Sequence, residues 1–175
     1  MGAGVGRATT RGTIGLGGGG AVGGTVRAAG VGPDLALPYG PGALADAIQA
    51  RPTTLVHGEL ATIDVAVSDG ELTPLDLAVP ADAPGALDIA RFVAGCSSVV
   101  DASREEIIAD YAAVAGPAYD EIAMRLSLLS ALVWLGWNKA LDAAEHPDPV
   151  VRKREKEDLD WWIEQSRLTL GSGPL

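Results

Sequence analysis

Cysteine and histidine are scarce in this chain of 175 residues, which contains one cysteine, Cys96, and two histidines. A single cysteine excludes an internal disulfide, and so few sulfur and imidazole ligands exclude a zinc site built from Cys and His. Disulfides are typical of oxidising compartments, whereas a lone cysteine suits a reducing one. The composition therefore favours a cytoplasmic protein.

Long apolar segments are also missing. The longest apolar run, residues 126–137, is interrupted by Ser127 and Ser130 and is shorter than the ~20 residues that a membrane-spanning helix requires. The N-terminus is dominated by glycine and alanine and lacks the apolar core of a secretory signal. We therefore expect a soluble protein that does not use a membrane as a partner.

Basic residues are also scarce relative to acidic ones. The chain has 13 Lys and Arg residues against 23 Asp and Glu residues, which gives a net charge of −10 at pH 7. Residues 1–32 contain no acid and only Arg7, Arg11 and Arg27 as charged side chains, so the remainder is more acidic still. Nucleic acids and anionic membranes are bound through clustered Lys and Arg. Neither is an expected partner, whereas a cationic small molecule is compatible with this charge.

Glycine is abundant, but only at the N-terminus, where residues 1–32 hold 13 of the 23 glycines. The run Gly15 to Gly20 formally matches a phosphate-binding loop, yet no apolar strand precedes it and no capped helix follows it. Glycine-rich sequence without that context is typical of flexible chain. We predict that residues 1–40 form a disordered tail, that residues 41–170 form one folded domain and that residues 171–175 form a second, short tail.

The folded part is expected to begin with a helix and a strand. Leu44, Ala47 and Ile48 have the i, i+3, i+4 spacing of a helix face, and this helix must end before Pro52. Residues 53–57 follow with β-branched and apolar side chains, which predicts a strand.

A β-hairpin is predicted next. Residues 63–67 alternate between apolar and other side chains, Asp69-Gly70 is a strong signal for a two-residue turn, and residues 71–77 supply the returning strand. Antiparallel pairing would bring the start of the first strand beside the end of the second. Asp64 and Asp76 occupy these two ends, so we expect them to lie close together.

The second half of the chain is expected to be helical. Ser103 and Glu106 form a capping box at the start of a helix that Gly116-Pro117 ends. A second helix is predicted over about 119–144, and a third from Asp148-Pro149 to about 170. The side chains expected to pack in the core are Ile107, Ile108, Tyr111 and Val114 in the first of these helices, Ile122, Leu126, Leu129, Leu132, Val133 and Trp137 in the second, and Trp161, Trp162 and Ile163 in the third.

Two features of these helices allow both a structural and a functional interpretation. Residues 150–160 are highly charged, and their Glu and Lys residues recur at i, i+4 spacing, which favours a solvated helix face over a binding site. Tryptophans are present at positions 134, 137, 161 and 162, and packing between helices is favoured over an aromatic cage. The fold class predicted from all these elements is α+β and mainly helical.

Residues 41–170 resemble the C-terminal lobe of the aminoglycoside phosphotransferase family, a branch of the protein-kinase-like fold. In that family a strand ends in His-Gly-Asp, an Asn follows five residues later, a hairpin leads to a second Asp, and a helix soon begins with Asp-Leu-Ala. The counterparts in this sequence are His57-Gly58-Glu59, Asp64, Asp76 before Leu77, and Asp88-Ile89-Ala90.

The resemblance implies a kinase-like C-lobe whose hairpin carries the catalytic-loop motif, with ATP as co-substrate and Mg²⁺ as cofactor. It implies that Glu59 occupies the position of the catalytic base and that Asp64 and Asp76 bind the metal. It also implies that His57 braces the loop and that Asp88 caps or holds it. Phosphoryl transfer depends mainly on positioning a hydroxyl and binding metal ions against phosphate oxygens, and carboxylates suit both tasks. The implied acceptor is a small hydroxylated metabolite. A positive charge on it would complement the net negative charge of the residues after 32, which we call the acidic body.

The sequence also departs from the family pattern. Glu59 is one methylene longer than the usual Asp, and a misplacement of ~1 Å can cost on the order of 10²-fold in rate. Asp64 replaces the usual Asn, and Ala61 stands where many relatives have a basic residue. Kinase-like folds bind the nucleotide phosphates with a lysine of an N-terminal β-lobe. Here every lysine follows the motif, and the sequence before it is too short and glycine-rich for such a lobe, so we expect a truncated chain with impaired activity.

Three functional hypotheses follow. The first is an ATP- and Mg²⁺-dependent phosphotransferase acting on a small-molecule hydroxyl. The second is a non-catalytic, pseudokinase-like lobe that binds a small molecule or a protein. The third is an unrelated α+β interaction module without a site. If the β-lobe is missing, the surface it would cover is exposed, which favours pairing with a second copy or with a partner chain.

Overall fold

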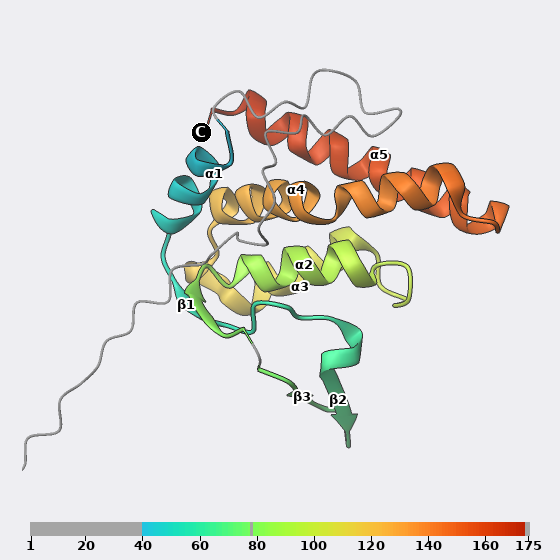
Figure 1. Ribbon diagram of the computed structural model, residues 1–175. Helices are drawn as coiled ribbons and strands as arrows, with labels where there is room; N and C mark the ends of the chain where they lie inside the picture. The colour runs from blue at the N-terminus through green and yellow to red at the C-terminus, as the bar shows by residue number, and fades with distance from the viewer. Residues whose placement is uncertain (1–39, 78, 174–175) are drawn as a thin grey trace, which may run out of the picture.

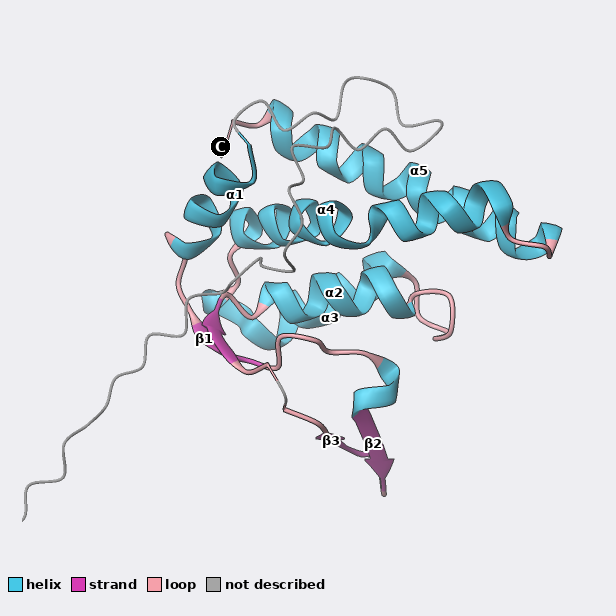
Figure 2. Ribbon diagram, in the orientation of Figure 1, coloured by secondary structure: helices cyan, strands magenta, loops and turns pink. Residues whose placement is uncertain are grey.

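The computed structural model describes residues 40–77 and 79–173. These residues form an α+β fold in which helices predominate and two small antiparallel sheets lie at one end (Figure 2). The α+β class predicted from the sequence is confirmed. The predicted tail over residues 1–40 lies outside the described residues except for Gly40, as do the last two residues of the predicted C-terminal tail. Among the described residues no helix is both long and apolar enough to cross a membrane.

Five α-helices make up most of residues 40–77 and 79–173. Helix α4 lies between α5 on one side and α2 on the other, α1 packs against α4, and α3 packs against α2 (Figure 1). Their bounds are α1 Gly40–Gln49, α2 Ala86–Cys96, α3 Arg104–Ala115, α4 Glu121–Glu145 and α5 Pro149–Gly171, and two short 3₁₀ turns cover Thr62–Asp64 and Gly116–Ala118.

The strands form two separate pairs. Strand β1 (Thr54–Val56) pairs with β4 (Ala81–Ala83), and β2 (Val65–Ser68) pairs with β3 (Glu71–Pro74). The predicted hairpin is confirmed, with Ser68 opposite Glu71. Both residues of the turn between them have positive φ, 53° at Asp69 and 82° at Gly70, as a tight hairpin turn with the twist of the strands requires.

The helix ends follow local sequence signals. The predicted capping box is confirmed: the Ser103 hydroxyl accepts from the N–H of Glu106, whose carboxylate in turn accepts from the N–H of Ser103 at 2.8 Å. Asp148 caps α5, and Pro149 follows as its first residue. Asp120 caps α4 and also pairs with Arg51, which ties the start of α4 to the chain after α1.

The core consists of two clusters of buried side chains. In one of them, alanines of α2 and α4 lie in the same cluster as Trp162 of α5; in the other, α1 packs on α4. Small side chains at helix contacts reduce the distance between backbones, so the larger residues fill the remaining space. The two clusters are Ala86, Ala90, Val93, Ala94, Ala123, Met124, Leu128, Ala131 and Trp162, and Leu44, Ile48, Leu126 and Leu129.

Several residues predicted to be buried are exposed. Val114 of α3 is 89% exposed, and on α4 the side chains of Ile122, Val133 and Trp137 also face solvent. Trp134 is exposed as well, with the Arg91 guanidinium 3.8 Å from its ring centroid. On α4 these predictions were wrong because apolar side chains occur on more than one side of the helix, whereas its neighbours among the described residues cover only part of its circumference. Val114 lies on α3, which has no fully buried residue. The periodicity of apolar residues does not show which side of a helix packs against another helix.

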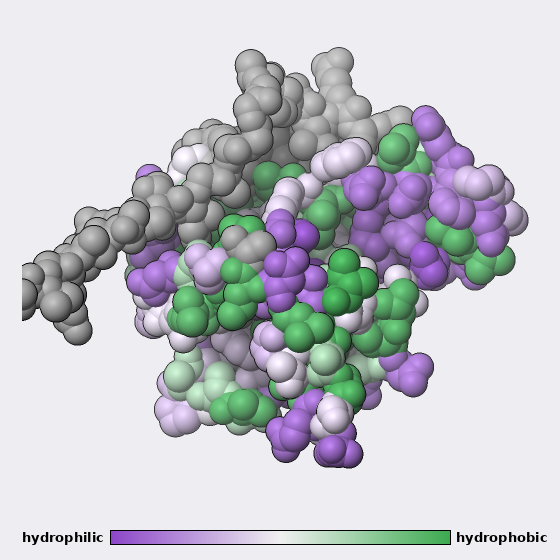
Figure 3. Space-filling model, turned by 60° about the horizontal axis from the view of Figure 1, so that its bottom comes forward, coloured by the Kyte–Doolittle hydropathy of each residue, from purple (hydrophilic) through white to green (hydrophobic). Residues whose placement is uncertain are grey.

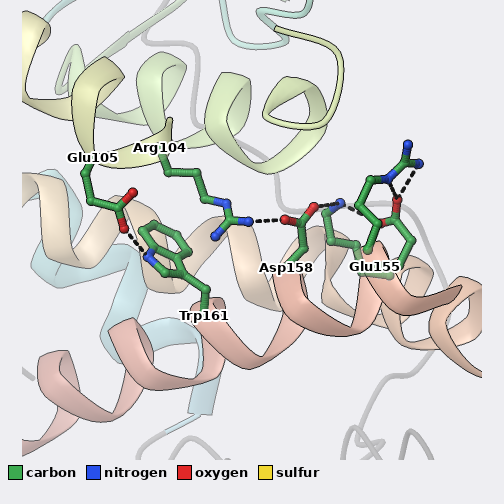
Figure 4. A network of polar contacts seen from close by, with 7 residues as sticks. Arg104, Glu105, Glu155, Asp158 and Trp161 are labelled. Carbon is green, nitrogen blue, oxygen red and sulfur yellow. Dashed lines mark hydrogen bonds and ion pairs between the residues drawn. The ribbon is translucent and has the colours of Figure 1, made fainter. Parts of the chain in front are cut away.

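The charged segment 150–160 is the largest departure from the sequence-based prediction. Its outer pairs, Lys153–Glu157 and Lys156–Asp160, are solvated as predicted. Glu155 and Asp158, however, are buried and form an ion-pair network between helices α3, α4 and α5 (Figure 4). The Lys139 ammonium of α4 donates to Glu155 at 2.7 Å and to Asp158 at 2.9 Å, Arg104 of α3 donates to Asp158, and Arg154 donates to Glu155 at 2.8 Å. The prediction of a wholly solvated face was therefore wrong.

This network makes stability depend on pH through Glu155. Burial by itself raises the pKa of Glu155, but hydrogen bonds from Lys139 and Arg154 outweigh it and hold the pKa below its ordinary value. A carboxylate with a lowered pKa in the folded state contributes stability above its unfolded pKa of about 4.3, and this contribution is lost as the pH falls through the folded pKa. We expect the melting temperature of the wild type to fall more steeply below about pH 4.3 than that of Glu155→Gln.

The matched control is Glu157→Gln, since Glu157 is exposed and belongs to a solvated i, i+4 pair on the same helix. Its melting curve should follow the wild type at every pH, measured by tryptophan fluorescence. Identical pH profiles for the wild type and Glu155→Gln would contradict the assignment of a lowered pKa to Glu155.

Candidate functional site

The loop after β1 contains the candidate motif, and His57 fixes its position. The His57 side chain is buried, and its Nε2 lies 2.6 Å from the carbonyl oxygen of Leu75, at the end of the hairpin. A carbonyl oxygen only accepts hydrogen bonds, so Nε2 carries the proton in this contact. Nδ1 is buried and has no partner among the described residues. His57 therefore joins the end of β1 to the segment that follows β3.

Asp88 holds the same loop from the other side. It lies in the first turn of α2, and its two carboxylate oxygens accept from the backbone N–H groups of His57 at 2.6 Å and Gly58 at 2.9 Å. Hydrogen bonds to an ionised carboxylate are roughly twice as strong as those between neutral groups. The carboxylate thus fixes two consecutive peptide units immediately before Glu59. The structure brings together His57 and Asp88, the two residues expected to support the loop.

Gly58 is required by its surroundings. Its φ is 88°, and a Cβ added there would lie 2.2 Å from the carbonyl oxygen of Val79. The loop and the segment that precedes β4 are therefore in close backbone contact, which only glycine permits.

The three candidate carboxylates lie around this braced loop. Glu59 and Asp64 are half-buried, and Asp76 is exposed. The backbone N–H of Leu75 donates to the carbonyl oxygen of Asp64 at 2.7 Å, so the two chain segments that carry Asp64 and Asp76 meet at the open end of the hairpin, as predicted. Asp76 has a φ of 50°, which is uncommon for a residue other than glycine. Backbone outliers of this kind cluster at functional sites, and the observed outlier motivates a functional hypothesis for Asp76.

The fit of this site to a metal ion depends on the number of ligands. No group of three His, Cys, Asp or Glu side chains within residues 40–77 and 79–173 is placed to hold a metal ion together. Mg²⁺ in phosphate-transferring sites, however, is commonly held by one or two carboxylates, with water and substrate phosphates as the other ligands. Asp64 and Asp76 lie on the two chain segments that meet here, so these segments carry the one or two carboxylates that such a site uses.

Sequence reasoning missed some contacts that position the site. The Cys96 sulfur, at the end of α2, accepts from the N–H of Thr62 at 3.3 Å and so holds the 3₁₀ turn that contains Asp64. The Leu75 and Val79 contacts use backbone carbonyl oxygens. No side-chain pattern could reveal such contacts, because every residue has this group.

Asp88→Ala is expected to lower the free energy of unfolding by about 2–4 kcal/mol, because it removes two charge-assisted hydrogen bonds and leaves two N–H groups without an acceptor. Asp88→Asn should cost less but still more than 1 kcal/mol, since its amide keeps one acceptor oxygen and turns a donor toward the other N–H. Urea unfolding followed by tryptophan fluorescence measures both. Asp82→Ala, an exposed aspartate of β4, is the control and should stay within about 0.5 kcal/mol of the wild type. An Asp88→Ala variant as stable as Asp82→Ala would show that the loop does not depend on this carboxylate.

Comparison with known proteins identifies no relative: no family model, no curated protein and no solved structure matches this chain.

Proposed function

We propose that residues 41–170 form a kinase-like C-lobe of the aminoglycoside phosphotransferase type, which binds magnesium and nucleotide phosphate at the open end of the hairpin. The observation that carries the proposal is the brace around the loop. Asp88 holds the N–H groups of His57 and Gly58, and His57 in turn holds the carbonyl oxygen of Leu75. One connected support thus holds the residues that directly precede Glu59 and Asp76, which supports the proposal that these two side chains act as base and metal ligand.

In this proposal Asp64 and Asp76 supply oxygen ligands for Mg²⁺, which would neutralise phosphate charge when bound. Glu59 follows the braced peptide units directly and orients the acceptor hydroxyl or takes its proton. His57 and Asp88 take no part in the chemistry; they keep the loop in place. The acidic body favours a small hydroxylated acceptor that carries positive charge.

The same residues support a second candidate function, a pseudokinase-like lobe that binds phosphate compounds or a partner without turnover. It is favoured by the length of the Glu59 side chain, which is one methylene longer than the aspartate usual at this position in the family. The longer side chain displaces the carboxylate from the place of the usual catalytic base. We therefore propose that this chain by itself catalyses phosphoryl transfer slowly at most.

A thermal-shift titration with ATP and Mg²⁺ tests the proposal. A ligand present at five to ten times its Kd stabilises a protein by about 1 kcal/mol, which for a chain of this size raises the melting temperature by about 2–4 °C. We expect this rise only when ATP and Mg²⁺ are both present. Asp76→Ala should abolish it, and Asp82→Ala, an exposed carboxylate outside the site, should preserve it.

Absence of a shift in the wild type, or an equal shift in Asp76→Ala, would refute binding at this site. Where the shift is seen, release of ADP in the presence of aminoglycoside acceptors distinguishes the two candidate functions. ADP release that Glu59→Gln lowers supports the phosphotransferase, and binding without ADP release supports the pseudokinase-like lobe.

A further inference from the structure

Large aliphatic side chains are exposed along the segment that contains β1, the hairpin and β4. Val67 and Leu72 lie opposite each other in the hairpin, and each is 70% exposed. Figure 3 shows this end of the molecule, where green apolar patches alternate with purple hydrophilic ones. Monomeric proteins rarely leave large contiguous apolar surfaces uncovered. We call this surface the hairpin face; its apolar residues are Leu55, Ile63, Val67, Leu72, Leu75, Leu77 and Val79.

The segment that carries the hairpin face has charged side chains of a single sign. No lysine or arginine occurs between Arg51 and Arg91, whereas six acidic residues accompany the apolar ones over residues 53–82. These acidic residues are Glu59, Asp64, Asp69, Glu71, Asp76 and Asp82. The surface is therefore complementary to a segment that combines apolar and basic side chains.

The hairpin also lacks support within the described part of the chain. Its sheet has two strands only, so each strand has a free edge, and β2 and β3 make most of their contacts with each other. An isolated two-stranded hairpin is marginally stable in water and gains stability from a third strand or a packed element. Strand β3 ends in Pro74, which cannot donate to a further strand, but β2 (Val-Ala-Val-Ser) has no proline and no charge to block its edge.

We propose that the hairpin face is a docking surface for a basic amphipathic segment of a different protein, which covers the exposed aliphatic side chains and offers Lys or Arg to the surrounding carboxylates. A second copy of this chain is a poor occupant, because it would bring six carboxylates against six with no base between them. An anionic membrane is repelled for the same reason. This inference requires neither ATP nor Mg²⁺, but three of the six carboxylates, Glu59, Asp64 and Asp76, also belong to the proposed phosphate site, so a docked basic segment would compete with Mg²⁺.

The test uses the full chain and three fluorescent 14-residue peptides: alternating Val-Lys, alternating Val-Glu, and alternating Ser-Lys. In fluorescence anisotropy at low salt, Val-Lys should bind at least tenfold more tightly than either of the others, because only it matches both the apolar and the charged character of the face. Binding should weaken at least threefold between 50 and 300 mM salt, as the ion pairs are screened. Equal affinity for Val-Lys and Ser-Lys would mean non-specific attraction to an acidic protein and would overturn the proposal.

Matched variants locate the surface. Val67→Ser with Leu72→Ser should reduce Val-Lys affinity at least fivefold, whereas Val150→Ser with Leu168→Ser should leave it unchanged. The control pair has the same residue types, with 73% and 53% exposure, on α5. All four side chains are exposed, so the variants should fold, which circular dichroism verifies. An equal effect of the two pairs would overturn the assignment to the hairpin face.

Two further experimental results would show that the hairpin face binds something other than a different protein. A dimer in light scattering that Val67→Ser with Leu72→Ser dissociates would identify a second copy as the occupant. Residues 1–32 carry arginine as their only charged type. If Val-Lys binds only after Arg7, Arg11 and Arg27 are all changed to serine, the occupant is this segment of the same chain, and the proposal of a different protein is wrong.

Discussion

Replacing Asp158 by asparagine is expected to lower the free energy of unfolding by about 3–5 kcal/mol, the range observed when one partner of a buried ion pair is removed. Asp158 is 2% exposed and accepts from both Lys139 and Arg104. The substitution keeps the shape of the side chain and removes its charge. Lys139 retains Glu155, but Arg104 loses the carboxylate that it contacts. Domains of this size are stable by about 5–15 kcal/mol, so the loss would be a large fraction of the total.

Asp160→Asn is the matched control for this prediction. Asp160 lies two residues further along α5 and pairs with Lys156, but its side chain is 61% exposed. Solvated i, i+4 pairs on helices contribute about 0.3–0.5 kcal/mol, so this variant should be nearly as stable as the wild type. Urea unfolding curves of the two variants and the wild type measure the difference. If both substitutions lower the free energy of unfolding by the same amount, the ion-pair network around Asp158 does not stabilise the fold as a buried network would.

The charged segment 150–160 shows where sequence reasoning stops. An i, i+4 pattern of base and acid describes both Lys156–Asp160, which is solvated, and Arg154–Asp158, whose aspartate is buried. What distinguishes them is the neighbour: Lys139 comes from α4 and Arg104 from α3. Spacing within one helix carries no information about which of its faces another helix will cover. The buried network could therefore not be predicted from the charge pattern.

Local signals were reliable by contrast. The Asp69-Gly70 turn, the Ser103–Glu106 capping box and the Asp148-Pro149 helix start were all predicted and are all present. Each depends on backbone conformations or hydrogen bonds within about four residues, which the sequence specifies directly. Strand β4 was not predicted, because Ala81-Asp82-Ala83 has no β-branched residue and becomes a strand only through its pairing with β1.

For the candidate site, the sequence indicated which chain segments meet but not how they are held. Antiparallel pairing was sufficient to place Asp64 and Asp76 at the same end of the hairpin. Asp88 was expected to cap or hold the loop, and the structure shows its carboxylate bonded to the N–H groups of His57 and Gly58. The positive φ of Asp76 had no signal in the sequence, because aspartate is common in many backbone conformations. Its proposed role in binding a metal stays a prediction.

Gly58→Ala is expected to destabilise the fold by at least about 3 kcal/mol. The added Cβ would meet the carbonyl oxygen of Val79 at 2.2 Å, and this atom belongs to the backbone, so relief requires that one of the two segments moves. Movement of the loop would stretch the hydrogen bonds from His57 and Gly58 to Asp88. The positive φ adds strain of about 1–2 kcal/mol. Equilibrium unfolding measures the loss, and the Mg²⁺- and ATP-dependent thermal shift should vanish in the same variant.

Gly70→Ala separates the clash from the conformational strain. Gly70 has nearly the same φ, 82° against 88°, but a Cβ there would meet no atom within 4 Å. Its substitution should therefore cost only the strain of the left-handed conformation, about 1–2 kcal/mol. The difference between the two variants, at least about 1 kcal/mol, measures the contact between the motif loop and Val79. If Gly58→Ala is no more destabilising than Gly70→Ala, the loop can move away from Val79 without loss of stability. A loop that moves at so little cost could not hold Glu59 in place for phosphoryl transfer.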